Sequence, residues 1–301
     1  MMLPLLSYIL DYLQARNPAQ TSKLRLRIGN ENAEWEAKVD SFFSRYKAYI
    51  ESRGLSLDYG LDCYLKLSAR MAHERMEFLR SGRYASSSFA DVEQQIYLNP
   101  EVFEYHMHGL VFAQFFWPEQ SARFQFFCQH IEKELVKGGR YLEIGGGHAL
   151  YILEAMRRSP ANTRFSLLDI SPSSMELAKG IARDEPIEFR LMNIFDYPIK
   201  EKFEFITMGE VIEHVEDPLS LLRRVRNLLA PGGGAFISAP TNSATIDHIY
   251  LFSSTDEIRA MLEAANFRIV REATRVAENM SEERARKLKV AVMFAAFVAP
   301  N

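Results

Sequence analysis

The sequence has little cysteine and no long apolar run. Its 301 residues include only two cysteines, Cys63 and Cys128, which lie far apart and form no CxxC pair. We therefore expect neither a disulfide framework nor a cysteine-rich zinc site, and a reducing, cytoplasmic location fits. No stretch reaches the roughly 18 consecutive apolar residues that indicate a transmembrane helix, so we expect no membrane span.

The sequence also lacks an excess of positive charge. Its 36 lysines and arginines are outnumbered by 39 aspartates and glutamates, which gives a formal net charge of −3. This balance argues against nucleic acid as a partner, although it does not exclude a local basic patch. The apolar start MMLPLLSYIL has no basic residues before it and no small-residue cleavage motif, and Asp11 follows it directly. It predicts an amphipathic helix rather than a signal peptide.

The chain divides into two regions of different periodicity. Apolar residues recur at helical spacing in residues 31–54 and 56–82, and each segment ends at a glycine, Gly54 or Gly82. From Gly139 onward, short apolar runs alternate with amphipathic segments, which predicts βαβ units and a parallel sheet. The last two runs, FRIVREATR and LKVAVMFAAFVA, have no long helix between them and are predicted to form an antiparallel hairpin. We expect a helical region over residues 1–125 and an α/β domain over residues 126–301.

The stretch RYLEIGGGHAL places three glycines between the first apolar run and a helical segment. Ligands bind α/β sheets at the carboxyl ends of the strands, and glycine there lets a ligand approach the backbone. The chain has no lysine in the pattern of a phosphate loop, and Leu150 replaces the third glycine of the dinucleotide pattern GxGxxG. The Glu143 carboxylate would repel a diphosphate, so a ligand with a cationic or neutral head is favoured.

Glu143, Gly145, Gly147 and Ala149 match the pattern (E/D)xGxGx(G/A), and the segment from Gly139 to Pro300 resembles the class I S-adenosylmethionine-dependent methyltransferases. The resemblance implies a Rossmann-like, seven-stranded, mostly parallel sheet with an antiparallel C-terminal hairpin, preceded by a helical domain or lid. It implies S-adenosyl-L-methionine as methyl donor and S-adenosyl-L-homocysteine as product. The cofactor-binding residues that it implies are Glu143, Gly145, Gly146, Gly147, Asp169, Ile170, Asn193, Ile194 and Gly209.

Two of these residues have expected roles. Asp169 ends the second apolar run, where a carboxylate can accept hydrogen bonds from ribose hydroxyls. Asn193 stands where the family has an aspartate near the adenine, and the backbone of Ile194 is the other adenine contact that the resemblance implies. His148, inside the glycine turn, has no assigned role.

The run TMGEVIEHVEDP looks like the corresponding run of the ubiquinone-biosynthesis-type small-molecule O-methyltransferases. Glu210, Glu213 and His214 are spaced i, i+3 and i+4, which places them on one face of a predicted helix. Such a group can bind a divalent cation, or His214 can serve as a general base. Solvated glutamates at a capped helix start are the third interpretation.

A second resemblance concerns a metal site. Asp247 and His248 are followed by an aromatic residue, a pattern similar to the small-RNA 2′-O-methyltransferases, in which two glutamates and two histidines hold a metal ion. The matching positions are Glu210, Glu213, His214 and His248. The resemblance therefore implies a divalent-cation site, and the metal and base alternatives stay open at this point.

The segment EYHMHGLVFAQFFWPEQ is rich in aromatic residues. In the family, segments before the first strand usually cover the active site, and the resemblance implies that such rings line the acceptor pocket. The predicted acceptor residues are Tyr105, His108, Phe116, Trp117 and Tyr250. The alternative is that the rings form a core between helices. His106 and His108 cannot share one helical face, so at most one is expected to face the pocket.

The preferred interpretation is methyl transfer to a small, apolar or aromatic acceptor, at oxygen, with a product in secondary or quinone metabolism. The alternatives are transfer to a carbon beside a carbonyl, transfer to an RNA 2′-oxygen, and a non-catalytic cofactor-binding partner protein. The retained Glu210, Glu213, His214 and His248 argue against the last. The sequence leaves open whether the acceptor is free or carrier-tethered, and whether the helical region is a lid or the surface of a homodimer.

Overall fold

A layer of helices precedes the sheet. The computed structural model of the chain describes residues 3–136 and 138–301. The helices of the first part are α1 (Pro4–Arg16), α2 (Pro18–Ile28), α3 (Ala33–Ser52), α4 (Leu57–Ser81), α5 (Phe89–Val92), the π-helical turn η1 (Glu93–Tyr97), α6 (Pro100–Phe116) and α7 (Pro118–Glu134). The predicted glycine ends of the two long segments are confirmed, because Gly82 directly follows α4 and Gly54 follows α3 after Arg53, each with φ +75°. The predicted N-terminal helix is present as α1, and Met1 and Met2 lie outside the described residues.

The second part forms one seven-stranded sheet in the order β3-β2-β1-β4-β5-β7-β6. Its strands are β1 (Arg140–Ile144), β2 (Arg164–Asp169), β3 (Ile187–Leu191), β4 (Phe203–Gly209), β5 (Leu229–Thr241), β6 (Phe267–Val276) and β7 (Val292–Pro300). Strands β1 to β5 pair in parallel, and β7 runs antiparallel to both β5 and β6. The predicted mostly parallel sheet and its antiparallel C-terminal hairpin are confirmed.

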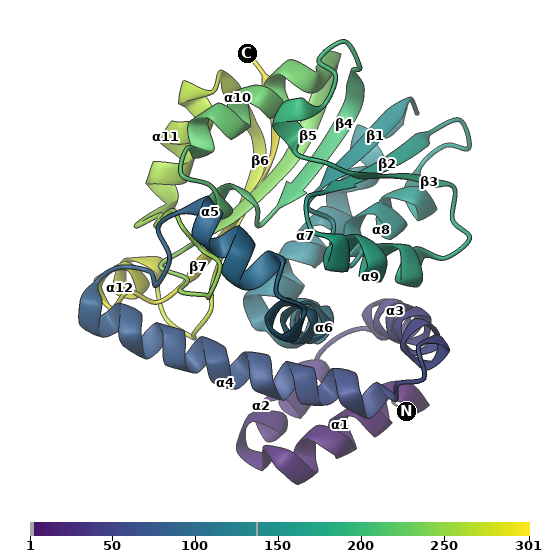
Figure 1. The fold of residues 1–301 in the computed structure, drawn as a ribbon, viewed down its shortest axis with the longest axis vertical. Coiled ribbons are helices and arrows are strands. Elements are labelled where there is room, and N and C mark those ends of the chain that lie inside the picture. The colour runs from purple at the N-terminus through teal and green to yellow at the C-terminus, as the bar shows by residue number, and fades with distance from the viewer. Residues whose placement is uncertain (1–2, 137) are drawn as a thin grey trace.

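Helices cover both faces of this sheet (Figure 1). The helices of the second part are α8 (Leu150–Arg158), α9 (Pro172–Ala182), η2 (Ile194–Asp196), η3 (Ile212–His214), α10 (Pro218–Leu228), α11 (Thr255–Ala264) and α12 (Glu282–Lys287). Helices α10 and α11 pack on one face, and α7, α8 and α9 pack on the other. Only the six-residue α12 lies between β6 and β7, as the short linking sequence predicted.

The helical layer and one face of the sheet share a single apolar core. One cluster of buried side chains runs from Leu6 and Ile9 of α1 through Phe112 of α6 to Phe236 of β5 and Phe297 of β7. Helix α7 crosses residue 125, so the predicted boundary between the two regions falls inside a continuous helix. Among the described residues, no helix has the length and apolarity needed to cross a membrane.

Candidate active site

The glycine turn lies at the carboxyl end of β1, as predicted. Gly145 has φ +70°, a conformation that side-chain-bearing residues rarely adopt, and its N–H donates to the Leu168 carbonyl at 2.8 Å. A Cβ on Gly147 would lie 2.4 Å from Cε of Met107 on α6. Gly145 and Gly147 line a cavity beside this turn, as do Ile170 and Gly209. The glycines thus let α6 and the turn close on one cavity.

Two buried carboxyl groups stand beside the turn. Burial raises the pKa of Glu143 to about 8, against the effect of a hydrogen bond from the Ile152 amide, and the nearby Asp169 adds to the rise. Burial likewise raises the pKa of Asp169 to about 7, although one of its oxygens accepts from the Ser171 amide at 2.8 Å. Oε2 of Glu143 is buried and has no hydrogen-bond partner among the described residues. Both groups line the cavity and can accept hydrogen bonds from a polar, uncharged or cationic ligand.

These pKa values predict a stability that depends on pH. Between pH 4.5 and pH 8 the folded state holds a proton on Glu143 that the unfolded state releases, so the free energy of unfolding falls as the pH rises through this window. From pH 6.5 to pH 9, the free energy of urea unfolding of the ligand-free protein should fall, and Glu143→Gln should lessen this fall by about 1–2 kcal/mol, with Asp169 and Glu213 contributing the rest. Glu188→Gln, which changes a half-exposed carboxylate on β3 of the same sheet, is the matched control. An equal decline in Glu143→Gln and the wild type would contradict the assignment.

The two predicted adenine contacts do not line the cavity. The Asn193 side chain accepts from the Phe195 amide at 3.0 Å and so caps η2. Ile194 belongs to the apolar core on the α10–α11 face, and its carbonyl accepts from Arg224 at 3.1 Å. Gly146 does not line the cavity either, and a Cβ there would meet the side chains of Glu143 and Leu167.

The EVIEHV run is not the helix that its spacing predicts. Glu210 follows β4 with φ +55°, and only Ile212–His214 form a 3₁₀ turn, η3. Glu210 therefore does not share a helical face with Glu213 and His214. One Glu210 oxygen lies 2.8 Å from Nη1 of Arg123 and accepts from the Ser238 hydroxyl at 3.2 Å. This ion pair, and not the predicted metal set, engages Glu210.

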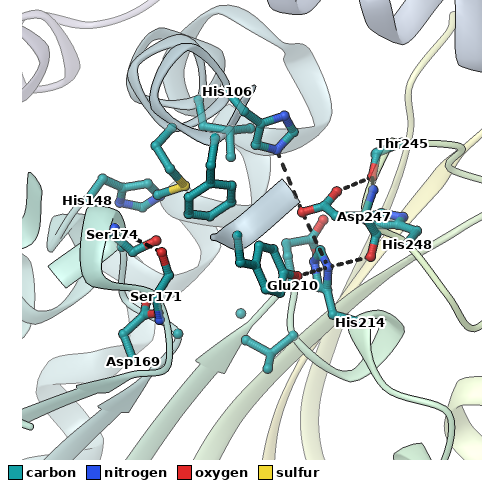
Figure 2. A pocket seen from close by; sticks show the side chains of 18 of the residues that line it. His106, His148, Asp169, Ser171, Ser174, Glu210, His214, Thr245, Asp247 and His248 are labelled. Carbon is teal, nitrogen blue, oxygen red and sulfur yellow. Dashed lines mark hydrogen bonds and ion pairs between the residues drawn. The ribbon is translucent and has the colours of Figure 1, made fainter. Parts of the chain in front are cut away.

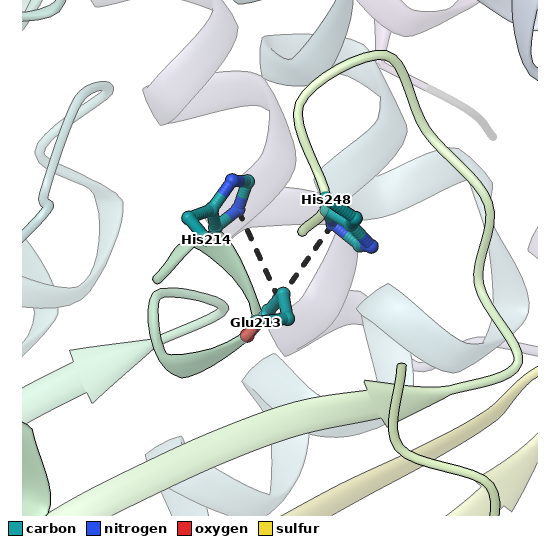
Figure 3. Close-up of side chains that lie close together, drawn as sticks. All are labelled: Glu213, His214 and His248. Carbon is teal, nitrogen blue, oxygen red and sulfur yellow. Dashed lines mark ion pairs between the residues drawn. The ribbon is translucent and has the colours of Figure 1, made fainter. Parts of the chain in front are cut away.

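The other three predicted metal ligands do converge (Figure 3). One ligand atom from each of Glu213, His214 and His248 lies within 4.8 Å of the others. Nε2 of His214 and Nε2 of His248 lie 4.0 and 3.8 Å from Oε1 of Glu213. The Glu213 side chain is 1% exposed, and neither of its oxygens has a hydrogen-bond partner among the described residues. Burial and the nearby Glu210 raise its pKa well above the usual range, so an ionised Glu213 needs a cation beside it.

The tautomers of the two histidines follow from their contacts. Nδ1 of His248 lies 2.7 Å from the Ser243 carbonyl, and Nδ1 of His214 lies 3.0 Å from the Asp247 carbonyl. A carbonyl oxygen only accepts, so Nδ1 carries the hydrogen in both rings. In the neutral ring, each Nε2 then carries a lone pair, which faces Glu213. Burial also lowers the pKa of His248 to about 3, which keeps this imidazole neutral and able to ligate.

Asp247 connects the histidines on the other side (Figure 2). Its Oδ2 lies 3.5 Å from Nδ1 of His214 and 3.8 Å from Nε2 of His106, which α6 contributes. Burial opposes ionisation of Asp247, but the imidazoles and the Thr245 hydroxyl hold its pKa below the usual range. The phenol of Tyr97 lies 3.0 Å from Nδ1 of His214. In Figure 2, His148, Asp169, Ser171 and Ser174 lie on one side of the cavity, and the three other histidines lie on the opposite side.

Most of the predicted acceptor residues are elsewhere. Of the five, only Trp117 lines the cavity. His108 is the wrong member of its pair, because its Nδ1 bonds the Tyr46 hydroxyl at 2.8 Å inside the helical core, whereas His106 lines the cavity. Phe116 packs on Phe43 and Tyr64 in that core. Tyr105 and Tyr250 also lie away from the cavity, with Tyr105 beneath Lys66 and Tyr250 on Glu257. The core interpretation therefore holds for His108 and Phe116.

Several residues that line the cavity are not predicted from the sequence. Arg123 is 2% exposed and donates to the Tyr151 hydroxyl at 2.7 Å and the Gln114 amide oxygen at 2.8 Å. Nothing in its amphipathic helical segment distinguishes it from a surface arginine. Burial lowers the pKa of His148 to about 3, and this neutral ring also lines the cavity. The i, i+2 spacing of His106 and His108 indicates that only one of the two can face the cavity, but it does not indicate which one.

The comparisons with known proteins agree with this architecture. A family model described as "Methyltransferase domain" matches residues 120–272, just over half of the chain. A ubiquinone biosynthesis O-methyltransferase of Xanthomonas campestris pv. campestris (strain B100) is 31% identical over 105 residues, which are 34% of this chain and 43% of that protein. One of Xanthomonas oryzae pv. oryzae (strain PXO99A) is 30% identical over the same shares. The chain thus spans less than half of the length of these relatives.

A solved structure supports the fold. The mitomycin 7-O-methyltransferase MmcR superposes with a TM-score of 0.53 at 13% identity, over 77% of this chain and 68% of that one. At this identity the likeness concerns the fold alone. With the family model, the acidic glycine turn and the strand order all in agreement, the chain belongs to the class I S-adenosylmethionine-dependent methyltransferase family.

Proposed function

We propose that this enzyme transfers the methyl group of S-adenosylmethionine to a hydroxyl oxygen of a small, apolar or aromatic molecule. The observation that carries the proposal is one continuous cavity, lined at one end by the glycine turn and Asp169 and at the other by His214 and His248. The names of the O-methyltransferase relatives favour oxygen over carbon as the acceptor atom.

The cofactor end suits a sulfonium amino acid joined to adenosine. We propose that Asp169 accepts hydrogen bonds from the ribose hydroxyls and that Glu143, with its orphaned oxygen, faces the amino-acid part. Arg123 lines the same end, and its buried guanidinium suits the carboxylate of the amino acid. The bound cofactor supplies an activated methyl group, and the chain supplies its orientation toward the acceptor.

At the acceptor end we propose a divalent cation held by Glu213, His214 and His248. Three features support a metal over a base without one: the lone pairs of both Nε2 atoms face Glu213, both Nδ1 atoms donate to carbonyls, and the Glu213 oxygens have no other partner among the described residues. Ligating histidines commonly donate their second N–H to a carbonyl or carboxylate. A bound cation would lower the pKa of the acceptor hydroxyl.

The walls favour an apolar acceptor. Between the two ends, the cavity is lined by apolar and aromatic side chains of the helical layer: Met71, Phe89, Phe103, Met107, Leu110 and Trp117. A flat apolar body can pack between these side chains while one polar group reaches the histidines. We propose on this basis that the helical region covers the active site.

The direct test is a methyl-transfer assay with isotopically labelled S-adenosylmethionine and a panel of phenols, with Mg²⁺, Mn²⁺ or Zn²⁺ added singly. Label should appear in ether products of one or more phenols. Label in a carbon–carbon bond, or in RNA and not in phenols, would replace the proposal with the corresponding alternative. Purified protein that binds the cofactor but labels no acceptor class would refute O-methyl transfer to phenols.

Metal binding itself can be measured without turnover. Equilibrium dialysis against Mn²⁺ or Zn²⁺ should show one bound ion per chain, and Glu213→Gln should weaken its binding by about 10- to 100-fold because an anionic ligand is lost. Glu210→Gln is the informative comparison, since Arg123 and not the cation engages Glu210. Its affinity should stay close to that of the wild type. A wild type with no stoichiometric ion, or an equal loss in both variants, would contradict the three-residue site.

A further inference from the structure

Residues 83–99, here called the strap, join α4 to α6 and pass on the side of α4 that faces the sheet (Figure 1). Two aromatic side chains of the strap line the cavity. Among its residues only Tyr84, Val92 and Ile96 are buried, and its regular structure consists of the four-residue α5 and the five-residue π-helical turn η1. Segments that bury little apolar surface open at a lower free-energy cost than the core. The strap is therefore the part of the cavity wall that we expect to open most readily.

The first half of the strap shares a backbone anchor with His248. The Tyr84 hydroxyl accepts from the Ser243 amide at 2.9 Å, and Nδ1 of His248 donates to the Ser243 carbonyl at 2.7 Å. The Tyr84 and His248 rings also meet edge to face, with centroids 5.9 Å apart. Ser86 adds a hydrogen bond to the Ile246 carbonyl at 3.2 Å. This half of the strap thus holds the loop that presents His248.

The second half of the strap contacts His214 directly. Nδ1 of His214 lies 3.0 Å from the Asp247 carbonyl and 3.0 Å from the Tyr97 hydroxyl. Because this nitrogen carries the ring hydrogen, the Tyr97 oxygen accepts from it. Glu216, two residues after His214, accepts from the Phe89 amide at 2.6 Å and attaches the strap to the same loop. The hydrogen bonds of both halves use Nδ1 and other atoms but not Nε2, so a cation and the closed strap are compatible.

A cation at the two Nε2 atoms would strengthen the contacts that close the strap. Coordination draws electron density from an imidazole, which makes its opposite N–H a stronger hydrogen-bond donor toward Tyr97. It also fixes the two rings that Tyr84 and Tyr97 contact. In the other direction, the closed strap holds both rings in the orientation that presents Nε2 to Glu213. Cation binding and strap closure should therefore favour each other, and by thermodynamic linkage each does so by the same factor.

We propose that the strap closes over the acceptor end of the cavity when a divalent cation occupies the three-residue site, and that Tyr84 and Tyr97 are the positioning residues that couple the two events. The inference rests on the metal site of the proposed function. Its consequence for the reaction is that the acceptor end is closed to water when the group that activates the acceptor is in place.

Hydrogen–deuterium exchange of the full chain, with and without saturating Mn²⁺, tests this coupling. Exchange is followed by mass spectrometry of peptides from residues 83–99. Mn²⁺ should slow their exchange by about 5- to 10-fold, the size expected for a coupling of one or two hydrogen bonds. Peptides from α1 and α2, which lie on the opposite side of α4 (Figure 1), should exchange as before.

Two variants test whether the tyrosines carry the coupling. Tyr97→Phe should reduce the protection by Mn²⁺ to about 2-fold or less, and its affinity for Mn²⁺ in equilibrium dialysis should fall by about the factor that the protection loses. Tyr84→Phe, which removes the acceptor of the Ser243 amide, should act in the same direction. Tyr105→Phe is the matched control, because this phenol lies beneath Lys66 and away from the cavity.

The outcomes separate this inference from the metal site on which it rests. If the wild type binds one Mn²⁺ ion and exchange of the strap does not change, the coupling is wrong and the metal site stands. The same holds if both tyrosine variants keep the full protection, or if Mn²⁺ protects α1 and α2 as strongly as the strap, since that is a general stabilisation of the fold by a bound ligand. If the wild type binds no ion, the metal site fails and the inference fails with it.

Discussion

His214→Ala is expected to lower kcat for methyl transfer by about 100- to 10,000-fold, the range for loss of a group that takes part in proton removal or ligates a catalytic metal. The affinity for S-adenosylhomocysteine should change little, because Asp169 and His148 lie across the cavity from His214 (Figure 2). Single-turnover rates and calorimetric titration of the cofactor product measure the two effects separately. A variant with near-normal turnover would remove His214 from the chemistry.

A comparison of His248→Ala with His214→Ala distinguishes a metal-ligand role of His214 from a general-base role. If both histidines hold a cation, either alanine variant should lose activity and metal together, since each removes one of three ligands. If His214 acts alone as a base, His248→Ala should retain most of the turnover. Added imidazole or a raised metal concentration that restores His248→Ala would support the ligand role.

Arg123→Met is expected to lower the free energy of unfolding by about 3–5 kcal/mol, the cost typical of removing one partner from a buried ion pair. Glu210 would be left with a largely buried carboxylate, and Tyr151 and Gln114 would each lose a hydrogen bond. This loss is a large fraction of the total, because the free energy of unfolding of a protein is typically roughly 5–15 kcal/mol. Urea unfolding of the ligand-free variant measures it.

Two comparisons make the Arg123 result specific. Arg45→Met removes the partly exposed Arg45–Glu185 pair and should cost less than about 1 kcal/mol. Adding Glu210→Gln to Arg123→Met should restore part of the lost stability, because the unpaired charge is then gone. Equal stability of Arg123→Met and the wild type, or no recovery in the double variant, would show that the ion pair does not stabilise the fold.

The features that the sequence predicts well are local ones. Helical spacing, glycine at helix ends and alternating apolar runs identify α3, α4 and all seven strands, because each depends on neighbouring residues. The same holds for the turn between β1 and α8, whose glycines and acidic residue are contiguous. The cavity lining around this turn is therefore largely predictable from the sequence, and the predicted residues that the cavity does not include are Gly146, Asn193 and Ile194.

The acceptor end is less predictable because separate segments build it. Tyr97 and His106 come from two helical segments, and which face of each helix meets the sheet depends on packing across the molecule. Glu210 was misassigned because its left-handed backbone breaks the helical period on which the assignment relied. The prediction that His108 rather than His106 lines the acceptor pocket is wrong for a similar reason. Residue spacing alone does not indicate which side of α6 faces the cavity.

Helix α6 contributes to two parts of the structure. Phe112 lies in the shared core, and His106, Met107 and Leu110 line the cavity wall. A substitution that reshapes the acceptor wall therefore also disturbs the contacts that attach the helical layer to the sheet. Substitutions that change the substrate range are therefore expected also to lower the free energy of unfolding, which has only a small margin in natural proteins. Broadening that range by directed evolution would call for compensating stabilisation elsewhere, most safely on the α10–α11 side of the sheet, whose core is separate.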